Sequence, residues 1–459
     1  MSSLSVVVLA AGQGKRMRSP MPKVLHPLAG RPLIAHVLDV ARSLAPQRIC
    51  VVYGHGGKTL PEAIGAPDLV LVRQEPQLGT GHALAQALPQ LGANGMTLVL
   101  YGDVPLIRLD TLKRMQDVGR DRVVVLTTQV DDPAGYGRVV RDRAGKVRAI
   151  IEDKDASPAQ RRLREISTGI MLLPTRRLSG WLSRIGNRNS QREYYLTDVI
   201  GLALKDKVRV ETVTPGTTSE VLGVNSKLQL AQAERAWQHG HALDLLDRGV
   251  MLADPARVDV RGTLACGEDV SIDVNCVFEG TVQLGDGVVI GANCVLRNVE
   301  IGAGTRIEPF TLMEDTNVGR QCRIGPYARL RPGNQIGNDV HIGNFVEIKA
   351  SEIRAGSKAN HLAYIGDSTV GRDVNIGAGT ITCNYDGANK HRTIIEDDVH
   401  IGSDVQLVAP VTVSRGATVG AGTTVWKDTP QGGLVINAKS QEHRPGWRRP
   451  AKKNVSDDE

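Results

Sequence analysis

Apolar runs alternate with helical patterns through the first half of the chain. The apolar runs at residues 6–11, 49–53, 69–73, 97–101 and 123–128 predict buried strands, and the patterns at residues 33–44 and 81–91 predict helices between some of them. This alternation favours an α/β fold, in which βαβ units surround a mostly parallel sheet. Ligands of such sheets bind beyond the carboxyl ends of the strands, so we expect functional residues directly after the strands.

From about residue 258 the apolar pattern changes to a period of six. Ile336, Ile342 and Ile348 follow one another at this spacing, and so do Val370 and Ile376. Hexapeptide repeats are typical of a parallel β-helix, in which the aliphatic side chains stack in the core. A glycine follows many of these residues, and we expect it to permit turn conformations that a Cβ would penalise. The second half therefore predicts an all-β repeat domain.

Two segments break the six-residue rhythm. They are residues 349–364 and 380–394. Insertions in a repeat protein map to loops and often form the binding face, although surface decoration is an equally simple reading. We expect both segments to be loops.

A different pattern joins the two halves. Residues 226–249 are rich in Leu, Ala, Gln and charged side chains and contain no proline, so they predict one long helix. We expect a first domain at residues 1–227, a helical linker at 228–249, and a repeat domain with a basic tail at 250–459.

Composition narrows the class of protein. Of the 459 residues, 41% are hydrophobic, which excludes general disorder, while the net charge of +7 favours anionic ligands such as nucleotides, sugar phosphates, coenzyme A or nucleic acid. The six cysteines form no C-x-x-C pair and indicate reduced cytosolic thiols. No apolar run approaches the roughly 18 residues of a membrane helix, and we expect no signal peptide.

A glycine-rich loop after the first predicted strand is the first candidate site. Gly12 and Gly14 let backbone N–H groups approach phosphate closely, and Arg16 and Lys23 add cations that suit a triphosphate. A tight turn with solvated charges is the plain alternative. Asp103 follows the strand at residues 97–101.

Oxygen ligands for a metal are the second element of this site. Asp103 could hold Mg²⁺, with Asn225 supplying another oxygen. The alternatives are a helix N-cap for Asp103 and a turn residue for Asn225.

A second candidate site lies in and around the two interruptions. His361 fits a general base at neutral pH, and the cations Arg331 and Lys349 suit a sugar phosphate. A carboxylate such as Glu347 can orient the ring of a catalytic histidine. A structural histidine is the usual alternative for a single His. Tyr364 and the pair Asn384–Tyr385 lie in the same region.

The motifs of the first half resemble those of the sugar-nucleotide pyrophosphorylases. The matching segments are LAAGQGKRM at residues 9–17, Pro22–Lys23, QLGTGHA at 77–83, YGD at 101–103, GYGR at 135–138, Thr168–Gly169 and GVN at 223–225. The resemblance implies a Rossmann-like nucleotidyltransferase domain with Mg²⁺ held by Asp103 and Asn225 and phosphates handled by Arg16 and Lys23. It implies uridine-nucleotide binding by Leu9, Ala10, Ala11, Gly12, Gln74, Gly79, Thr80, Tyr101 and Gly102, and amino-sugar binding by Gly137, Glu152, Ser167 and Thr168.

Two residues depart from this family pattern. Lys15 stands where a small hydroxyl residue is common, which adds a positive charge beside the phosphates. Ser167 stands where the family has an asparagine that contacts the sugar.

The segments GPYARLRPG, GNFVEIK, GSKANHLAYIGD and NIGAGTITCNYDGANKHRT resemble the acetyltransferase half of the bifunctional bacterial GlmU family. The family's N-acetylglucosamine-1-phosphate uridylyltransferase and glucosamine-1-phosphate N-acetyltransferase activities make UDP-N-acetylglucosamine for peptidoglycan and lipopolysaccharide synthesis. The resemblance implies a left-handed β-helix, a cytoplasmic homotrimer, and His361 as the base with Glu347 as its partner. It implies glucosamine-1-phosphate binding by Arg331, Lys349, Tyr364 and Asn375, and acetyl-CoA binding by Ala378, Asn384, Tyr385, Ser403 and Ala421, with Lys439 beside Ala438, where the family has an arginine.

Two other readings compete with a bifunctional enzyme. A nucleotidyltransferase whose β-helix serves only oligomerisation would leave His361, Arg331 and Lys349 unexplained. A scaffold or a nucleic-acid binder would leave the loop at residues 12–23 and Asp103 unexplained. The sequence also offers no basic surface interleaved with aromatic residues, which binding of single-stranded nucleic acid would favour. We therefore expect small-molecule substrates (UTP, acetyl-CoA and the two amino-sugar phosphates), no nucleic acid and no membrane insertion.

Overall fold

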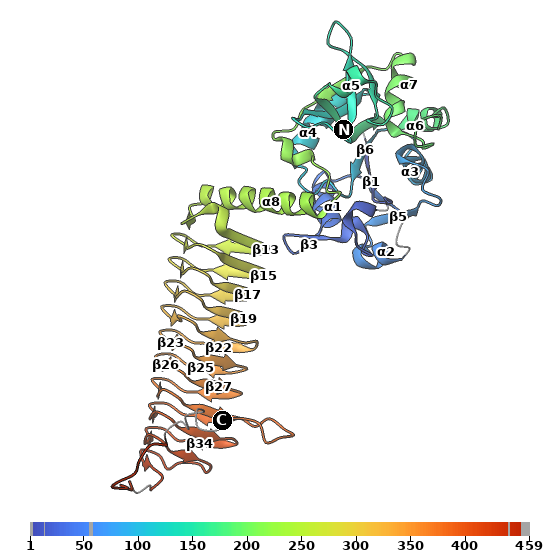
Figure 1. The fold of residues 1–459 in the computed structure, drawn as a ribbon. Helices are drawn as coiled ribbons and strands as arrows, with labels where there is room; N and C mark the ends of the chain where they lie inside the picture. Colours follow the sequence, from blue (N-terminus) through green and yellow to red (C-terminus); the bar gives the residue numbers. More distant parts are fainter. Residues whose placement is uncertain (1–2, 13, 55–57, 439–440, 451–459) are drawn as a thin grey trace, which may run out of the picture. The chain divides into compact units, whose positions relative to one another are not determined.

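A computed structural model of the chain describes residues 3–12, 14–54, 58–438 and 441–450. The chain forms two compact units (Figure 1). The first unit comprises Met1–Thr263 with Val277–Gly280, and the second comprises Leu264–Cys276 with Thr281–Glu459.

The first unit contains a central sheet with helices on both faces. The strands of this sheet are β1 (Leu4–Leu9), β4 (Arg48–Tyr53), β5 (Leu69–Arg73), β6 (Met96–Tyr101), β7 (Val123–Gln129), β8 (Gly137–Arg141), β9 (Val147–Ile151), β10 (Glu165–Pro174) and β11 (Val210–Val213). The first unit also contains the paired strands β2 (Pro27–Leu28) and β3 (Arg31–Pro32), the short strand β12 (Met251–Leu252) and the beginning of β13 (Val258–Cys266). Its helices are α1 (Leu33–Ser43), α2 (Thr59–Ile64), α3 (Thr80–Ala87), α4 (Leu109–Gly119), α5 (Pro158–Arg161), α6 (Thr175–Leu182), α7 (Val199–Lys205) and α8 (Lys227–Asp247).

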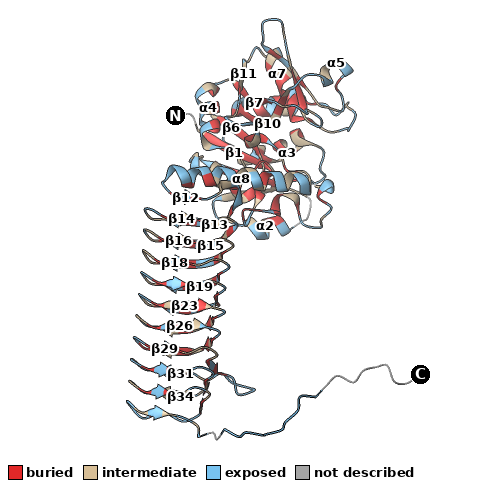
Figure 2. Ribbon diagram, turned by 60° about the vertical axis from the view of Figure 1, so that its left-hand side comes forward, coloured by how far each residue is buried: buried red, intermediate tan, exposed pale blue. Residues whose placement is uncertain are grey.

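The central sheet has the strand order β11-β7-β10-β6-β1-β4-β5. Parallel pairing joins β6, β1, β4 and β5, as the sequence predicts. The expectation of a mostly parallel sheet is confirmed, since β11 and β7 also pair in parallel. The exception along this order is β10, which runs antiparallel between β6 and β7 and also pairs with β8. Successive residues of β1 point to opposite faces, so that Val6 and Val8 enter one apolar core and Val7 and Leu9 enter the other. Figure 2 shows the strands of this sheet largely in red, as buried elements.

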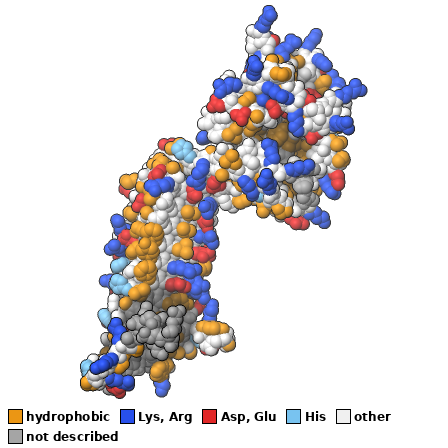
Figure 3. Space-filling model, viewed as in Figure 1, with side chains coloured by type: hydrophobic (Ala, Val, Ile, Leu, Met, Phe, Trp, Pro, Cys, Tyr) orange, Lys and Arg blue, Asp and Glu red, His pale blue; other side chains and the backbone are white. Residues whose placement is uncertain are grey.

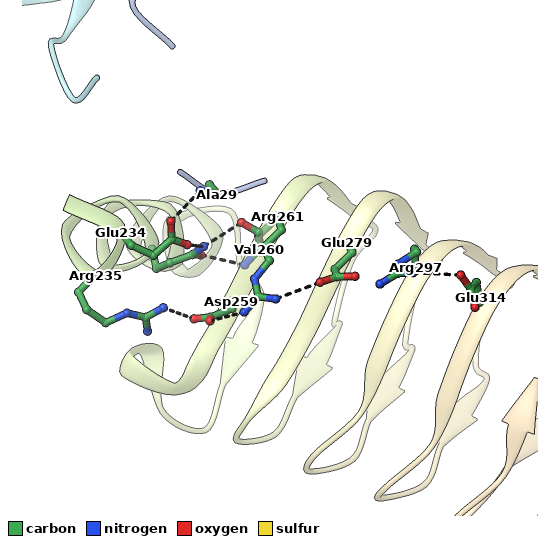
Figure 4. Close-up of polar contacts among 10 residues, drawn as sticks. Ala29, Glu234, Arg235, Asp259, Val260, Arg261, Glu279, Arg297 and Glu314 are labelled. Atoms are coloured by element: carbon green, nitrogen blue, oxygen red, sulfur yellow. Dashed lines mark hydrogen bonds and ion pairs between the residues drawn. The ribbon is translucent and has the colours of Figure 1, made fainter. Parts of the chain in front are cut away.

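The long helix predicted at residues 226–249 is α8. Ser226 caps its start by accepting a hydrogen bond from the N–H of Gln229. Glu234 accepts a hydrogen bond from the N–H of Ala29 at 2.7 Å, which ties the helix to the β2–β3 hairpin. Arg235 forms an ion pair with Asp259, just after the helix (Figure 4).

The second unit is a parallel β-helix. Its strands are β14 (Ser271–Ile272), β15 (Cys276–Leu284), β16 (Val289–Ile290), β17 (Val295–Ile301), β18 (Arg306–Ile307), β19 (Leu312–Val318), β20 (Arg323–Ile324), β21 (Arg329–Leu330), β22 (Asn334–Ile336), β23 (His341–Asn344), β24 (Glu347–Lys349), β25 (Glu352–Ile353), β26 (Lys358–His361), β27 (Tyr364–Gly366), β28 (Ser368–Val370), β29 (Asn375–Ile376), β30 (Ile381–Cys383), β31 (Thr393–Ile395), β32 (His400–Ile401), β33 (Gln406–Val408), β34 (Val411–Val413), β35 (Thr418–Val419), β36 (Thr424–Val425) and β37 (Leu434–Val435).

Each turn of the β-helix stacks in register on the next. Along one wall, Arg306 pairs with Arg323, which pairs with His341, and then Lys358 and Asn375 follow. The glycines after the core residues serve close approach more than turn formation. Gly337, for example, has no positive φ, and a Cβ there would lie 2.8 Å from the N atom of Ala355 on the following turn.

The two predicted interruptions have different structures. Residues 349–364 are not an insertion, because Glu347 pairs with Tyr364 and the wall continues. Ser351, Ser357 and Ala359 fill the core positions of this turn, and small side chains there hide the aliphatic pattern. Ser357 Oγ donates to Gly371 O at 2.7 Å, which satisfies a buried hydroxyl.

Residues 380–394 contain a true insertion. Asn375 pairs with His400, so this turn is longer than its neighbours. The additional chain forms a loop that projects from the β-helix, drawn in orange in Figure 1, and an antiparallel bridge joins Tyr385 to Lys390 within it. The expectation of a loop is confirmed for this segment alone.

One corner of the β-helix carries exposed aromatic side chains. Phe310, Tyr327 and Phe345 all have positive φ, at 61°, 55° and 57°, which is uncommon for bulky residues. The Tyr327 ring stacks on Phe310 with centroids 4.8 Å apart and on Phe345 at 5.3 Å. We call these three residues the aromatic column. Figure 3 shows hydrophobic side chains gathered along the β-helix on the face in view.

Candidate active sites

The first candidate site lies where several strands of the first unit end. Leu9 pairs with Tyr101, so the loops that follow β1 and β6 leave the sheet side by side. The N–H of Gly102 donates to Leu9 O at 3.0 Å, and the N–H of Gln74, directly after β5, donates to Tyr53 O at 2.7 Å. Gly102 and Gln74, which the sequence analysis gives as candidate binding residues, therefore lie directly after strands.

A cavity of about 560 Å³ opens at this edge. Its lining includes the predicted residues Leu9, Ala10, Ala11, Gly12, Lys23, Gln74, Gly79, Thr80, Tyr101 and Asp103. It also includes Lys15, Gln77 and Glu193. Glu193 follows no strand and belongs to no motif that we recognised, so sequence reasoning missed it.

The loop before α3 is held in place by a distant segment. The N–H of Tyr194 donates to Leu78 O, and the N–H of Gly81 donates to Tyr194 O, both at 2.8 Å. Gly79 has φ 106°, and a Cβ there would lie 2.7 Å from Tyr194 O, so only glycine fits. Buried Gln74 donates to Gly79 O at 3.1 Å and supports the loop from below.

Tyr101 links this cavity to the predicted sugar residues. Burial raises the pKa of the Tyr101 hydroxyl well above its usual value, and the charges of Glu152 and Asp103 raise it further. The hydroxyl therefore stays protonated, and it forms a hydrogen bond with Thr80. A Cβ on Gly169 would lie 2.7 Å from the Tyr101 ring, so this glycine makes room for it.

The predicted sugar-binding residues differ in the hydrogen bonds that their side chains already make within the protein. Glu152 accepts a hydrogen bond from Thr197 Oγ1 at 2.8 Å, and burial raises its pKa. Gly137 lies beside it, with an added Cβ 3.6 Å from Glu152 Oε1. Thr168 Oγ1 donates to Leu126 O at 2.9 Å, and Ser167 is buried with its hydroxyl accepting from the N–H of Gly169 at 3.3 Å.

A lysine occupies the place where the sequence predicts a metal. Lys23 Nζ contacts Asp103 Oδ2 and lies 2.8 Å from Asn225 Oδ1. Both side chains of the ion pair are largely buried, with 13% and 14% exposed. The two predicted metal ligands thus converge on one cation, and their oxygens are of the kind that Mg²⁺ prefers. Within the described residues no group of three or more His, Cys, Asp or Glu could hold a metal, so further ligands would come from phosphate or water.

Arg16 lies at the rim of this arrangement. Its side chain is exposed, and its charge lowers the pKa of Tyr136, whereas burial, the larger effect, raises it. Tyr136 in turn interacts with the backbone of Gly223, next to Asn225.

The second candidate site follows one column of the β-helix. Asn344 pairs with His361 on adjacent turns. In the same register, Ala378, Ser403 and Ala421 occupy the equivalent position on the following turns. Residues predicted to bind acetyl-CoA therefore continue the line that His361 begins.

His361 has a partner that the sequence analysis did not predict. Its Nδ1 lies 3.0 Å from Asn344 Oδ1, and because this oxygen can only accept, Nδ1 carries the proton. Glu347, the expected partner, instead accepts from Arg331 Nη1 at 3.0 Å. β-helix pairing places Asn344 directly beside His361 and Glu347 beside Tyr364, and the role of Glu347 as a partner of His361 stays a prediction.

Cations gather one column away. Lys349 lies close to Lys390 from the projecting loop, and this neighbour is the main cause of a lowered pKa at Lys349. The positive charge of Arg331 lowers it further, whereas Asp367 raises it. An anion between these cations would relieve their repulsion. Lys390 is not among the residues predicted from the sequence, although a lysine inside a break in the repeat is a signal for such a role.

The remaining predicted residues surround this cation cluster or lie beyond it. Asn384 is buried and donates to Asp367 Oδ2 at 2.5 Å and to Tyr364 Oη at 3.4 Å. Asn375 is exposed, and Tyr385 lies on the projecting loop with 61% of its surface exposed. Lys439 lies outside the described residues.

Comparison with known proteins identifies the family. Residues 6–167 match a MobA-like NTP transferase domain, residues 266–298 and 315–350 match the bacterial transferase hexapeptide, and residues 392–427 match a hexapeptide repeat of succinyl-transferase. Proteins called "Bifunctional protein GlmU" from Azoarcus sp. (strain BH72) and Paraburkholderia phymatum are both 61% identical over 98% of this chain and 100% of their own length. The chain belongs to the GlmU family. The GlmU protein of Nitrosomonas eutropha, at 58% identity over 98% of this chain and 99% of its own, agrees.

Membership of the GlmU family fits two chemically distinct sites in one chain. The relatives are named as bifunctional proteins. The polar cluster of the first unit joins Lys23 to Asn225, whereas that of the second joins His361 to Asn344. No helix in the described part of the chain has the length and apolar character needed to span a membrane.

Proposed function

We propose that this GlmU protein makes UDP-N-acetylglucosamine by two reactions at two sites. The β-helix transfers an acetyl group from acetyl-CoA to glucosamine-1-phosphate. The first unit then transfers a uridylyl group from UTP to N-acetylglucosamine-1-phosphate and releases pyrophosphate. The proposal is supported by 61% identity to a bifunctional GlmU protein over 98% of this chain. It is also supported by a polar cluster in each unit, Lys23 with Asn225 in the first and His361 with Asn344 in the second.

Positioning of charges drives the uridylyl transfer. A phosphate oxygen of the sugar attacks the α-phosphorus of UTP, and pyrophosphate leaves on the opposite side. Lys23 and Arg16 neutralise the charge on the phosphates, while the backbone of residues 9–12 lines the cavity. Mg²⁺, held by Asp103 and Asn225, would supply Lewis-acid stabilisation of the phosphate oxygens. We assign contacts with the sugar to Tyr101, Gly137, Glu152, Ser167 and Thr168.

His361 provides the base for acetyl transfer. With its Nδ1 proton donated to Asn344, the ring has its lone pair on Nε2. Nε2 takes a proton from the sugar amine as the nitrogen attacks the thioester carbon, and the coenzyme A thiolate leaves. Arg331, Lys349 and Lys390 bind the sugar phosphate, with Tyr364 and Asn375 nearby. We assign acetyl-CoA binding to Ala378, Asn384, Tyr385, Ser403 and Ala421, and Lys439 is kept as a further candidate for this role.

The assembly and the location of the enzyme are also proposals. A homotrimer is supported by the aromatic column, whose side chains are about half exposed and have no cover within the described chain. A cytoplasmic location is supported by the buried thiols of Cys50, Cys276, Cys294 and Cys322, which form no disulfide. The domain division at residues 227 and 250 is kept as part of the proposal.

Two assays test the function. Thiol release from acetyl-CoA with glucosamine-1-phosphate, and pyrophosphate release from UTP with N-acetylglucosamine-1-phosphate, are measured on the wild type, His361→Ala and Asp103→Asn. We expect His361→Ala to lose only thiol release and Asp103→Asn to lose only pyrophosphate release. A wild type that releases pyrophosphate but no thiol would show that the β-helix is a scaffold in this protein.

A further inference from the structure

We propose that Lys23 occupies the position of the divalent cation in the nucleotide-free enzyme, and that a metal ion must displace it. Metal binding then depends on a nucleotide that can receive the displaced ammonium. This inference rests on the proposed uridylyl transfer. It adds that binding of the metal ion is coupled to binding of the nucleotide.

The two oxygens around Lys23 Nζ are held in fixed positions. Asn225 Nδ2 donates to Gly223 O at 3.3 Å, which turns Oδ1 toward the lysine. The N–H of Asn225 donates to Gln229 Oε1 at 2.8 Å, and the N–H of Val224 donates to Asp103 O at 2.8 Å. The pair of oxygens is therefore built before any ligand arrives, and a cation between them satisfies both.

A metal ion and the ammonium cannot share this position. Lys23 Nζ already contacts the Asp103 oxygen at hydrogen-bond range, and the site is largely buried, so repulsion between the two cations is weakly screened. A free divalent ion must therefore break two charge-assisted hydrogen bonds of Lys23 before it binds. Without phosphate, the displaced ammonium would give up the Asp103 carboxylate and the Asn225 amide oxygen.

Phosphate oxygens can provide that partner. Lys23 lines the same cavity as Gly12 and Lys15, where the sequence pattern and the proposed function place the triphosphate. The lysine stem packs against the loop, since a Cβ on Gly14 would lie 2.8 Å from Lys23 Cβ, so the base of the side chain is fixed. Its long, flexible stem lets the ammonium exchange one partner for another from that fixed base. The exchange gives the metal to Asp103 and the ammonium to the phosphates, so both charges keep a partner.

Affinity for free Mn²⁺, without nucleotide, tests the proposal. It is measured by titration calorimetry on wild type, Lys23→Met, Lys15→Met and Asp103→Asn. Lys15→Met is the matched control, because it removes the same charge from the same cavity without touching Asp103. We expect Lys23→Met to bind Mn²⁺ about tenfold or more tightly than wild type, Lys15→Met to change the affinity less than about twofold, and Asp103→Asn to abolish this binding.

Several outcomes would overturn the proposal. Equal or weaker Mn²⁺ binding by Lys23→Met means that the lysine does not compete, and an equal gain in Lys15→Met means that the effect is general electrostatics. If Lys23→Met does not fold, Lys23→Gln, which removes the positive charge but keeps a polar side chain, replaces it, and its affinity for Mn²⁺ should likewise exceed that of wild type. Pyrophosphate release by the wild type is measured separately, so failure of the uridylyl-transfer function is distinguished from failure of the lysine exchange.

Discussion

His361 shows how one hydrogen bond sets the chemistry of a single residue. Its side chain is exposed, and its contact with Asn344 determines which ring nitrogen is free. An amide oxygen cannot donate, so it selects the tautomer with Nε2 as the base. A carboxylate partner would in addition stabilise the charged ring, which a neutral amide does to a smaller extent. Asn344 is therefore a positioning residue for the proposed acetyl transfer.

Substitution of Asn344 tests this role through the pH profile. In Asn344→Leu the ring loses its acceptor, and we expect kcat/KM of thiol release to fall by about tenfold or more. In Asn344→Asp the carboxylate stabilises the protonated ring, so the acid limb of the profile should move to higher pH. Pyrophosphate release is the internal control and should not change. An Asn344→Asp profile that matches wild type would contradict the assignment.

Glu152 offers a second prediction at the residue scale, on stability. Burial raises the pKa of its carboxyl, so the folded protein binds a proton more tightly than the unfolded chain, and stability falls as pH rises past the carboxyl range. Glu152→Gln keeps the acceptor for Thr197 but carries no charge. We expect its Tm to exceed that of wild type at pH 7 and the difference to shrink toward pH 4.

Glu62, an exposed residue in the first turn of α2, provides the control for the Glu152→Gln substitution. Glu62→Gln should show no gain in Tm at pH 7. A Glu152→Gln variant that is less stable than wild type at pH 7 would mean that the negative charge is stabilised by a group not identified here.

At the scale of elements, α8 depends on polar contacts as well as packing. Ala233 and Trp237 pack against the β2–β3 region, while one face of the helix is exposed (Figure 2). Gln238 is buried, and its amide both accepts from the N–H of Val260 at 2.8 Å and donates to Val260 O at 2.9 Å. This single side chain joins the middle of α8 to β13.

Removal of that amide should weaken the first unit. Gln238→Ala leaves the backbone N–H and C=O of Val260 without their partners, and we expect a loss of about 1–3 kcal/mol in the free energy of unfolding, measured by denaturant titration. Gln232→Ala, on the exposed face of the same helix, is the matched control and should change stability by less than about 0.5 kcal/mol. Equal losses in the two variants would contradict the importance of the Val260 contact.

At the scale of the whole molecule, the aromatic column is a candidate surface for contact with another protein chain. Tyr327 is 47% exposed, Phe310 is 48% exposed and Phe345 is 55% exposed, and all three have a backbone conformation that bulky residues rarely adopt. Exposed apolar columns of this kind mark contact surfaces between proteins. Association of copies of the chain through this column would cover it.

The proposed homotrimer gives this surface a direct test. Tyr327→Glu places a charge between two aromatic rings, and we expect light scattering to show monomers where the wild type shows trimers. Leu228→Glu, which replaces an exposed apolar residue of α8 that is 69% exposed, should remain trimeric. A Tyr327→Glu protein that stays trimeric would place the contact elsewhere.

The sequence by itself determined those helices and strands whose apolar pattern lies within one segment of the chain. The strands before residues 10, 74 and 102, the helix at 227–247 and the six-residue repeat were all predicted, because apolar periodicity reports directly which face of each element is buried. The glycine-rich loop and Asp103 were predicted to lie beyond strand ends, and the structure places them around one cavity.

Only the tertiary structure decided which distant residues meet. Lys23 meets Asp103 and Asn225 across 80 and 202 residues of sequence, and His361 meets Asn344 because adjacent turns of the β-helix place them side by side. The antiparallel course of β10 and the regular turn at residues 349–364 were likewise invisible in the pattern, since small buried serines resemble loop residues in a sequence. Periodicity specifies the buried face of an element, whereas the partner of a polar side chain depends on how the elements are stacked.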